Sequence, residues 1–162
     1  THGFDDQGRQ FDSKGNLSDW WTPEDAQKFT EKTRVLVDQF NGYKSINGMT
    51  VNGELTLGEN IADFGGLTVA LTALRKATNN NLKTPALDGF TPLQRFFISY
   101  SQVWRQNIRD EELMRRLKED VHSPGENRVN GGLVNVPEFY EAFNVKPNNK
   151  MYVAPEKRAV IW

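Results

Sequence analysis

The 162-residue sequence contains no cysteine, which excludes disulfide bonds and metal sites built on thiolates. Its net charge is −1, so charge gives no argument for a nucleic acid or an anionic membrane surface as a partner. No apolar run approaches the roughly 20 residues that a membrane-spanning helix needs. Histidine is also scarce. A metal site would have to combine His2 or His122, the only two histidines, with Asp and Glu.

The composition is that of a globular protein, with 37% hydrophobic and 25% charged residues. A chain of this length can form one domain with a substantial core, and we predict a single domain over residues 1–162. The chain begins with Thr-His and not with Met, so the lack of a signal peptide carries no information about location.

Apolar residues recur at helical spacing over most of the chain, which predicts a mainly α fold with long loops and at most short β hairpins. Thr22-Pro23 and Thr91-Pro92 are typical helix starts, because Thr caps a helix and Pro suits its first position. The predicted helices cover residues 22–42, 56–78, 91–104, about 110–120 and 137–143.

The segments between these helices are rich in turn-forming residues. A short hairpin is expected around Ser13–Gly15, within the polar stretch 3–21. Residues 43–55, 79–90 and 122–136 are predicted to be loops, and residues 145–162 to lie across the surface. Gly65-Gly66, inside the second helix, suggests close backbone packing or a local bend.

Glu59 and Asp63 are four residues apart and share one face of the predicted helix 56–78. A carboxylate can bind a metal ion, and a neighbouring carboxylate can orient an imidazole that binds the same ion. His2 is the obvious imidazole. These residues together predict part of a zinc site.

A second set of residues has the chemistry that a hydrolytic site needs. Asp120, two residues before His122, favours the imidazolium form of that histidine. A cationic histidine and an arginine such as Arg128 could stabilise a developing oxyanion.

Each of these residues also has a purely structural explanation. His2 could be a frayed terminal residue, and Glu59 and Asp63 could be solvated charges on a helix face. His122 could be stabilised by a helix dipole, and Arg128 could be an ordinary surface arginine. Spacing alone does not decide between these explanations and a zinc site.

Several short strings, taken in order, point to a known family. They are Thr1-His2-Gly3-Phe4-Asp5-Asp6, Trp20-Trp21-Thr22, Leu57-Gly58-Glu59-Asn60-Ile61-Ala62-Asp63, Gly65-Gly66-Leu67, Gln102-Val103-Trp104, Asp120-Val121-His122-Ser123-Pro124-Gly125, Arg128 and Trp162. The ordered set resembles the C-terminal catalytic part of the neprilysin family of zinc metalloendopeptidases, from the first residue to the last.

The resemblance assigns zinc ligation to the first cluster. In the family's His-Glu-x-x-His motif, His2 matches the second histidine, so the first histidine and the general-base glutamate would lie upstream of Thr1. Glu59 matches the third zinc ligand. Asp5 and Asp63 resemble the two aspartates that each hold a histidine ligand.

The resemblance also assigns roles to the second cluster. His122 matches the histidine that stabilises the tetrahedral intermediate, with Asp120 as its orienting partner. Arg128 matches the arginine that contacts a backbone carbonyl of the substrate.

These matches imply a zincin-type helical C-terminal subdomain, truncated within the His-Glu-x-x-His motif, from a larger metallopeptidase catalytic domain. We expect the parent enzyme to use Zn²⁺ and to cleave small peptides, with the upstream remainder of the polypeptide as the partner of this segment. The isolated chain should bind little or no zinc and be inactive. The alternatives are a non-catalytic module from a pseudoenzyme of the same fold and an unrelated helical domain.

One departure from the family bears on the source of the chain. Animal members carry cysteines where this sequence has Arg105 and Ala159. The resemblance therefore indicates a bacterial member, and it favours an extracytoplasmic location, periplasmic or at the cell surface, over a cytoplasmic one.

Overall fold

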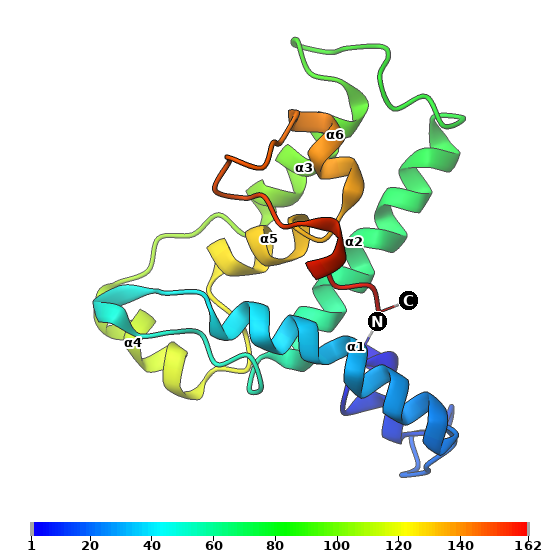
Figure 1. The fold of residues 1–162 in the computed structure, drawn as a ribbon, viewed down its shortest axis with the longest axis vertical. Helices are drawn as coiled ribbons and strands as arrows, with labels where there is room; N and C mark the ends of the chain where they lie inside the picture. The colour runs from blue at the N-terminus through cyan, green and yellow to red at the C-terminus, as the bar shows by residue number, and fades with distance from the viewer. Residues whose placement is uncertain (1, 162) are drawn as a thin grey trace.

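The computed structural model describes residues 2–161 and consists mainly of helices joined by long loops (Figure 1). The helices are α1 (Pro23–Asn41), α2 (Leu57–Ala77), α3 (Pro92–Val103), α4 (Asp110–Glu119), α5 (Gly125–Leu133) and α6 (Pro137–Phe143), with the 3₁₀ turns η1 (His2–Phe4), η2 (Gly8–Gln10), η3 (Ile46–Gly48) and η4 (Pro155–Lys157). Thr1 and Trp162, which belong to the strings quoted above, lie outside the described residues.

Extended structure within residues 2–161 is limited to isolated antiparallel bridges, of which Phe11–Leu17 flanks the expected hairpin. The predicted mainly α fold is therefore confirmed.

Helices α1 and α3 begin where their capping residues predict. The Thr22 side chain accepts a hydrogen bond from the backbone N–H of Asp25, with Pro23 at the first helical position. Thr91 and Gln94 form a reciprocal capping box, in which each side chain accepts a hydrogen bond from the other's backbone N–H.

The core forms where α2 packs against α1 and α5, and where α3 packs against α6 (Figure 1). Apolar side chains from these helices are almost completely buried, and burying each one contributes about 1.5–3 kcal/mol. The core residues of these helices are Phe29, Leu36, Phe40, Ile61, Phe64, Leu67, Leu71, Leu93, Phe97, Val129, Leu133 and Phe139. The packing of α2 against α5 places the first turn of α2 next to the loop between α4 and α5.

The prediction of a loop over residues 122–136 is wrong, because Gly125–Leu133 forms helix α5. Its three glycines lower helix propensity, so the sequence pattern concealed it. Tertiary packing explains one of them. A Cβ atom at Gly131 would lie 2.3 Å from the Phe40 ring, so only glycine lets α5 approach α1 this closely.

The expectation for the glycine pair in α2 is wrong at Gly66. A Cβ atom at this position would meet no atom within 4 Å, so no packing in the described residues requires glycine here. Gly65 is buried, and α2 is one continuous helix from Leu57 to Ala77.

The C-terminal segment is not simply spread over the surface as predicted, because Ala159 and Ile161 are buried in the core. The backbone N–H of Ala159 donates to the Asn135 side chain at 2.7 Å, and the Lys32 ammonium donates to the Ile161 carbonyl at 3.1 Å. Two apolar residues in a short irregular segment have no helical period, and the sequence therefore gave no sign of their burial.

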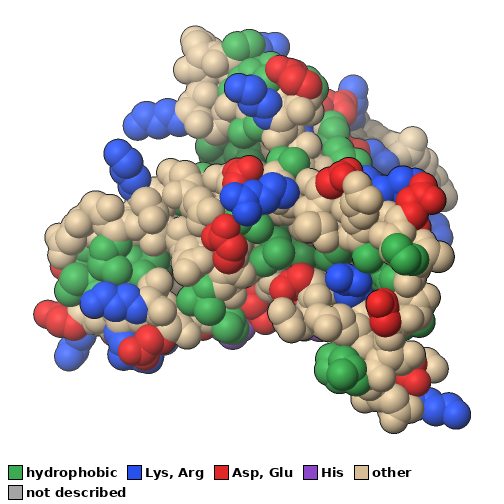
Figure 2. Space-filling model, turned by 60° about the horizontal axis from the view of Figure 1, so that its bottom comes forward, with side chains coloured by type: hydrophobic (Ala, Val, Ile, Leu, Met, Phe, Trp, Pro, Cys, Tyr) green, Lys and Arg blue, Asp and Glu red, His purple; other side chains and the backbone are tan. Residues whose placement is uncertain are grey.

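Charges of both signs are interspersed over the face seen in Figure 2, in keeping with the near-zero net charge. Among the described residues, no helix combines the length and the hydropathy needed to cross a membrane.

Candidate active site

Glu59, in the first turn of α2, lies between the two histidines. Its Oε1 atom is 3.4 Å from Nε2 of His2, and its Oε2 atom is 3.4 Å from Nε2 of His122. The Glu59 side chain is 18% exposed, whereas the two imidazoles are about half exposed. The structure thus brings together three side chains from the start of the chain, from α2 and from the α4–α5 loop.

Asp5 orients the His2 ring through its Nδ1 atom. Nδ1 of His2 lies 2.7 Å from Oδ2 of Asp5, while Oδ1 of Asp5 accepts hydrogen bonds from the backbone N–H groups of Gln7 and Gly8. Asp5 is only 5% exposed. A Cβ atom at Gly8 would lie 1.7 Å from the His2 carbonyl oxygen, so glycine is required for this turn. The arrangement leaves Nε2 of His2 facing Glu59.

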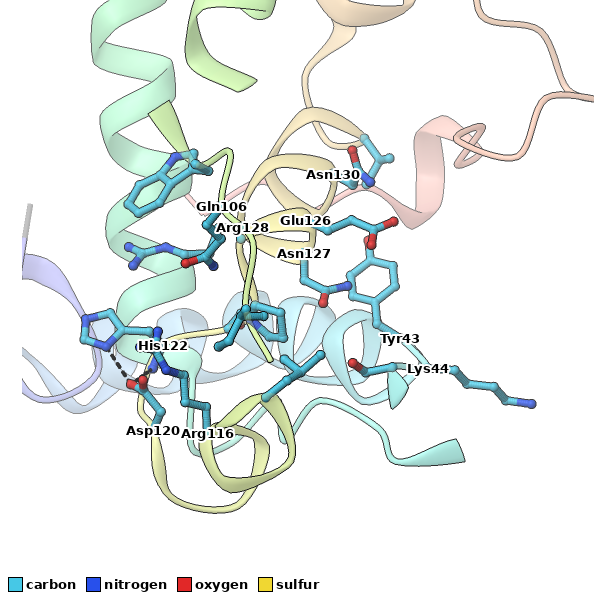
Figure 3. A pocket seen from close by; sticks show the side chains of 18 of the residues that line it. Tyr43, Lys44, Gln106, Arg116, Asp120, His122, Glu126, Asn127, Arg128 and Asn130 are labelled. Atoms are coloured by element: carbon cyan, nitrogen blue, oxygen red, sulfur yellow. Dashed lines mark hydrogen bonds and ion pairs between the residues drawn. The ribbon is translucent and has the colours of Figure 1, made fainter. Parts of the chain in front are cut away.

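His122 is held in the same manner by Asp120, in the loop between α4 and α5. Oδ1 of Asp120 accepts from the backbone N–H of His122 at 2.9 Å and lies 2.7 Å from its Nδ1 (Figure 3). Burial would raise the pKa of Asp120, but the hydrogen bonds from His122 outweigh burial and hold the pKa below its usual value. Asp120 is therefore an anion near neutral pH and orients the ring.

Arg128, on α5, is the cation of the site. Its guanidinium donates to Asp63 at 2.5 and 2.8 Å and to Oε2 of Glu59 at 3.2 Å, and it stacks on the Trp104 ring at 3.9 Å. Burial would lower the pKa of Arg128, but its hydrogen bonds to Asp63 and the charge of Glu59 raise it. Arg128 is therefore a fixed positive charge.

Asp63 lies against Arg128 in the described structure, where its carboxylate accepts hydrogen bonds from the guanidinium. His2 is held by Asp5. The resemblance pairs Asp63 with the other histidine ligand, and that pairing stays a prediction.

A cavity of about 680 Å³ adjoins the site, with His122, Asp120 and Arg128 in its wall (Figure 3). Tyr43 and Asn127 also line this cavity. The cavity gives a ligand access to the histidine and the arginine together.

The residues present supply part of a zinc site. Nε2 of His2 and the Glu59 carboxylate are nitrogen and oxygen donors of the type that Zn²⁺ prefers, and they face one another. No group of three or more His, Cys, Asp or Glu side chains within residues 2–161 is arranged to hold a metal ion. The donors therefore fit two positions of a three-ligand zinc site.

Sequence reasoning missed the roles of two contacts. Trp104 was recognised only as part of a string, and its stacking on Arg128 depends on the missed helix α5. Ser123 and Asn60, also quoted only within strings, form a buried hydrogen bond beside the site at 2.8 Å. No sequence signal links residues 63 positions apart.

The comparisons with known proteins agree with one another over the whole chain. A sequence model of peptidase family M13 matches residues 1–159. Human neprilysin is 42% identical over 166 residues, and the neutral endopeptidase of Lactococcus lactis subsp. lactis is 41% identical over 162 residues. Both alignments cover 100% of this chain, but only 22% and 24% of those relatives.

Solved structures show the same relationship. A crystal structure of the Mycobacterium tuberculosis zinc metalloprotease Zmp1 in complex with an inhibitor has a TM-score of 0.94 at 42% identity, covering 99% of this chain and 25% of that protein. The PepO structure from Lactobacillus rhamnosis has a TM-score of 0.85 at 41% identity, with 99% and 24% covered.

The fold is accordingly that of a helical part of a neprilysin-type zinc metalloprotease. The chain belongs to peptidase family M13, the neprilysin family. It spans about a quarter of the length of the relatives it matches.

Proposed function

We propose that residues 1–162 are the C-terminal part of the catalytic domain of a zinc-dependent endopeptidase that cleaves internal bonds of small peptides. The observation that carries this proposal is the placement of Glu59, whose two carboxylate oxygens face the Nε2 atoms of His2 and His122 at 3.4 Å each. Membership of peptidase family M13 supports it independently.

His2 and Glu59 would hold the zinc ion in this proposal. Asp5 accepts a hydrogen bond from Nδ1 of His2, which leaves the Nε2 lone pair for the metal. When bound there, zinc would supply the Lewis-acid chemistry that activates a scissile carbonyl and a water nucleophile.

His122 and Arg128 would act on the substrate. With Nδ1 held by Asp120, the imidazolium of His122 can donate from Nε2 to the oxyanion of the tetrahedral intermediate. Arg128, clamped by Asp63 and Trp104, would donate to a backbone carbonyl of the bound peptide. Both donors line the cavity, which would receive part of the peptide.

Two groups required by this chemistry are not among the 162 residues, since the sequence has no His-Glu-x-x-His string. By the family pattern, the other histidine ligand and the base glutamate would precede Thr1. We therefore expect the 162-residue chain alone to bind little or no zinc and to hydrolyse no peptide.

The test is peptide hydrolysis by the longer polypeptide from the same gene. The longer chain is expected to cleave internal bonds, and Glu59→Gln and His122→Gln to reduce kcat by about 10²-fold or more. Glu31→Gln, an exposed change on α1, is the matched control and should leave the rate unaltered. A chain that has another residue at the base position and no activity would be the pseudoenzyme instead.

Source and location belong to the same proposal. Arg105 and Ala159, in place of cysteines that animal members carry, favour a bacterial enzyme, although the similar proteins come from both animals and bacteria. The resemblance to bacterial members of the family favours an extracytoplasmic location. Fractionation of the source cells followed by immunodetection would test the location, and a purely cytoplasmic signal would contradict it.

A further inference from the structure

A chain of buried hydrogen bonds runs beneath the site, from the His122 loop into the start of α2. The Ser123 hydroxyl donates to Oδ1 of Asn60 at 2.8 Å, and Nδ2 of Asn60 donates to the Thr56 hydroxyl at 2.9 Å. Thr56 in turn donates to the Asn52 carbonyl at 2.9 Å. Ser123, Asn60 and Thr56 are only 3–4% exposed, so water cannot replace these bonds.

The chain has one possible direction. The Asn52 carbonyl can only accept, so the hydroxyl proton of Thr56 is used there. Thr56 must then accept from the amide nitrogen of Asn60, which leaves Oδ1 of Asn60 to accept from Ser123. Each donor and acceptor has a fixed role, and asparagine suits the central position because its side chain both donates and accepts.

The two ends of the Ser123–Asn60 bond are next to residues of the site. Asn60 follows Glu59 in α2, and Ser123 follows His122 in the loop. The side chains of Glu59 and His122 face each other in the site. Their neighbours in the sequence, Asn60 and Ser123, are buried and hydrogen-bond each other. The bond therefore ties the backbone that carries His122 to the backbone that carries Glu59.

The groups of the site cannot fix this geometry by themselves. The His122 ring is 47% exposed and 3.4 Å from Glu59, and a pair of that kind contributes little. Asp120, which holds the ring, belongs to the same loop and moves with it. The buried hydrogen bond between Ser123 and Asn60 restrains the position of the loop, which the exposed contacts do not.

We propose that Asn60 and Ser123 are positioning residues that hold the His122 ring against Glu59. The role rests on the proposed function, because it matters only if His122 acts on a substrate bound near Glu59. The geometric statement can nonetheless be tested in the 162-residue chain, without zinc and without activity.

The experiment is NMR of the chain, in which two histidines give two sets of ring signals. In the wild-type chain both rings should show nuclear Overhauser contacts to the Glu59 side chain. Ser123→Ala, and independently Asn60→Leu, which is similar in size but cannot accept the Ser123 hydrogen bond, should abolish the His122–Glu59 contact while the His2–Glu59 contact persists. Ser101→Ala is the matched control, because this hydroxyl donates only within α3, to the Ile98 carbonyl.

The persistence of the His2 contact shows that each variant is folded. A folded Ser123→Ala chain that keeps the His122–Glu59 contact would overturn the proposal, as would loss of that contact in Ser101→Ala. If Asn60→Leu does not fold, Ser123→Ala decides alone. The outcome is separate from that of the proposed function, because hydrolysis by the longer polypeptide can fail while the ring contact still depends on Ser123.

Discussion

At the scale of single residues, two aspartates in different parts of the chain each orient one histidine ring. Asp5 holds Nδ1 of His2 and Asp120 holds Nδ1 of His122, each at 2.7 Å and from within three residues. Such a local pair forms with little loss of chain entropy, because the loop that it closes is short. Both Nε2 atoms are thereby directed at Glu59.

Asp5 is expected to contribute to stability as well as to orientation. Asp5→Ala would leave the backbone N–H groups of Gln7 and Gly8 without their acceptor, at a cost of about 1–3 kcal/mol. Urea denaturation measures the difference. Asp19→Ala, at an exposed aspartate in the same segment, is the control. Equal losses for the two variants would contradict the role given to Asp5.

Tyr100, beside the site, is expected to set a limit on stability at high pH. Burial, reinforced by the charge of Asp63, raises its pKa to about 12 from an ordinary 10.0. Above pH 10 the unfolded chain therefore releases the Tyr100 proton, whereas the folded chain keeps it until the pH approaches 12. The contribution of this group to the free energy of unfolding is complete below pH 10 and is lost as the pH rises towards 12.

The measurement is tyrosinate absorbance, with the free energy of unfolding followed in parallel. Tyr100→Phe should remove the corresponding ionisation and flatten this part of the stability profile. Ionisation of Tyr100 near pH 10 in the folded chain would show that burial does not control this phenol.

At the scale of helices, prediction from sequence succeeded where local chemistry decides. Thr22 and Thr91 cap their own helices, so α1 and α3 could be placed from a few neighbouring residues. Helix α5 could not, because its helical state depends on packing against α1 and α2, which end at Asn41 and Ala77, far before Gly125 in the sequence.

The candidate site, like the helices, could be predicted from the sequence only in part. Short strings identified His2, Glu59, His122 and Arg128 as candidates. The Asp63–Arg128 pair and the Ser123–Asn60 bond join residues more than 60 positions apart, and only the fold brings them together.

A pair of identical substitutions tests the packing of α2 and α5. Gly131→Ala should destabilise the chain by about 1–3 kcal/mol or more, because the new methyl group overlaps the buried Phe40 ring. Gly66→Ala should stabilise it by about 0.5–1 kcal/mol, because the methyl group enters open space in a helix interior. Thermal unfolding gives both values. The same sign of change for both would contradict the packing described here.

At the scale of the whole molecule, the site depends on tertiary structure. Its groups come from the first turn of the chain, from α2, from the α4–α5 loop and from α5. The three converging side chains, His2, Glu59 and His122, each come from a different segment, so a chain that loses the packing of α2 against α5 should lose the site with it.

The zinc content of two purified proteins tests the central claim most directly. After dialysis, the account predicts little or no zinc on the 162-residue chain and about one zinc ion on the longer polypeptide that supplies the third ligand. Glu59→Gln in the longer polypeptide should remove that zinc, while Glu31→Gln should keep it. Zinc retained at full stoichiometry by the Glu59→Gln protein would contradict the claim that Glu59 and His2 are two of its ligands.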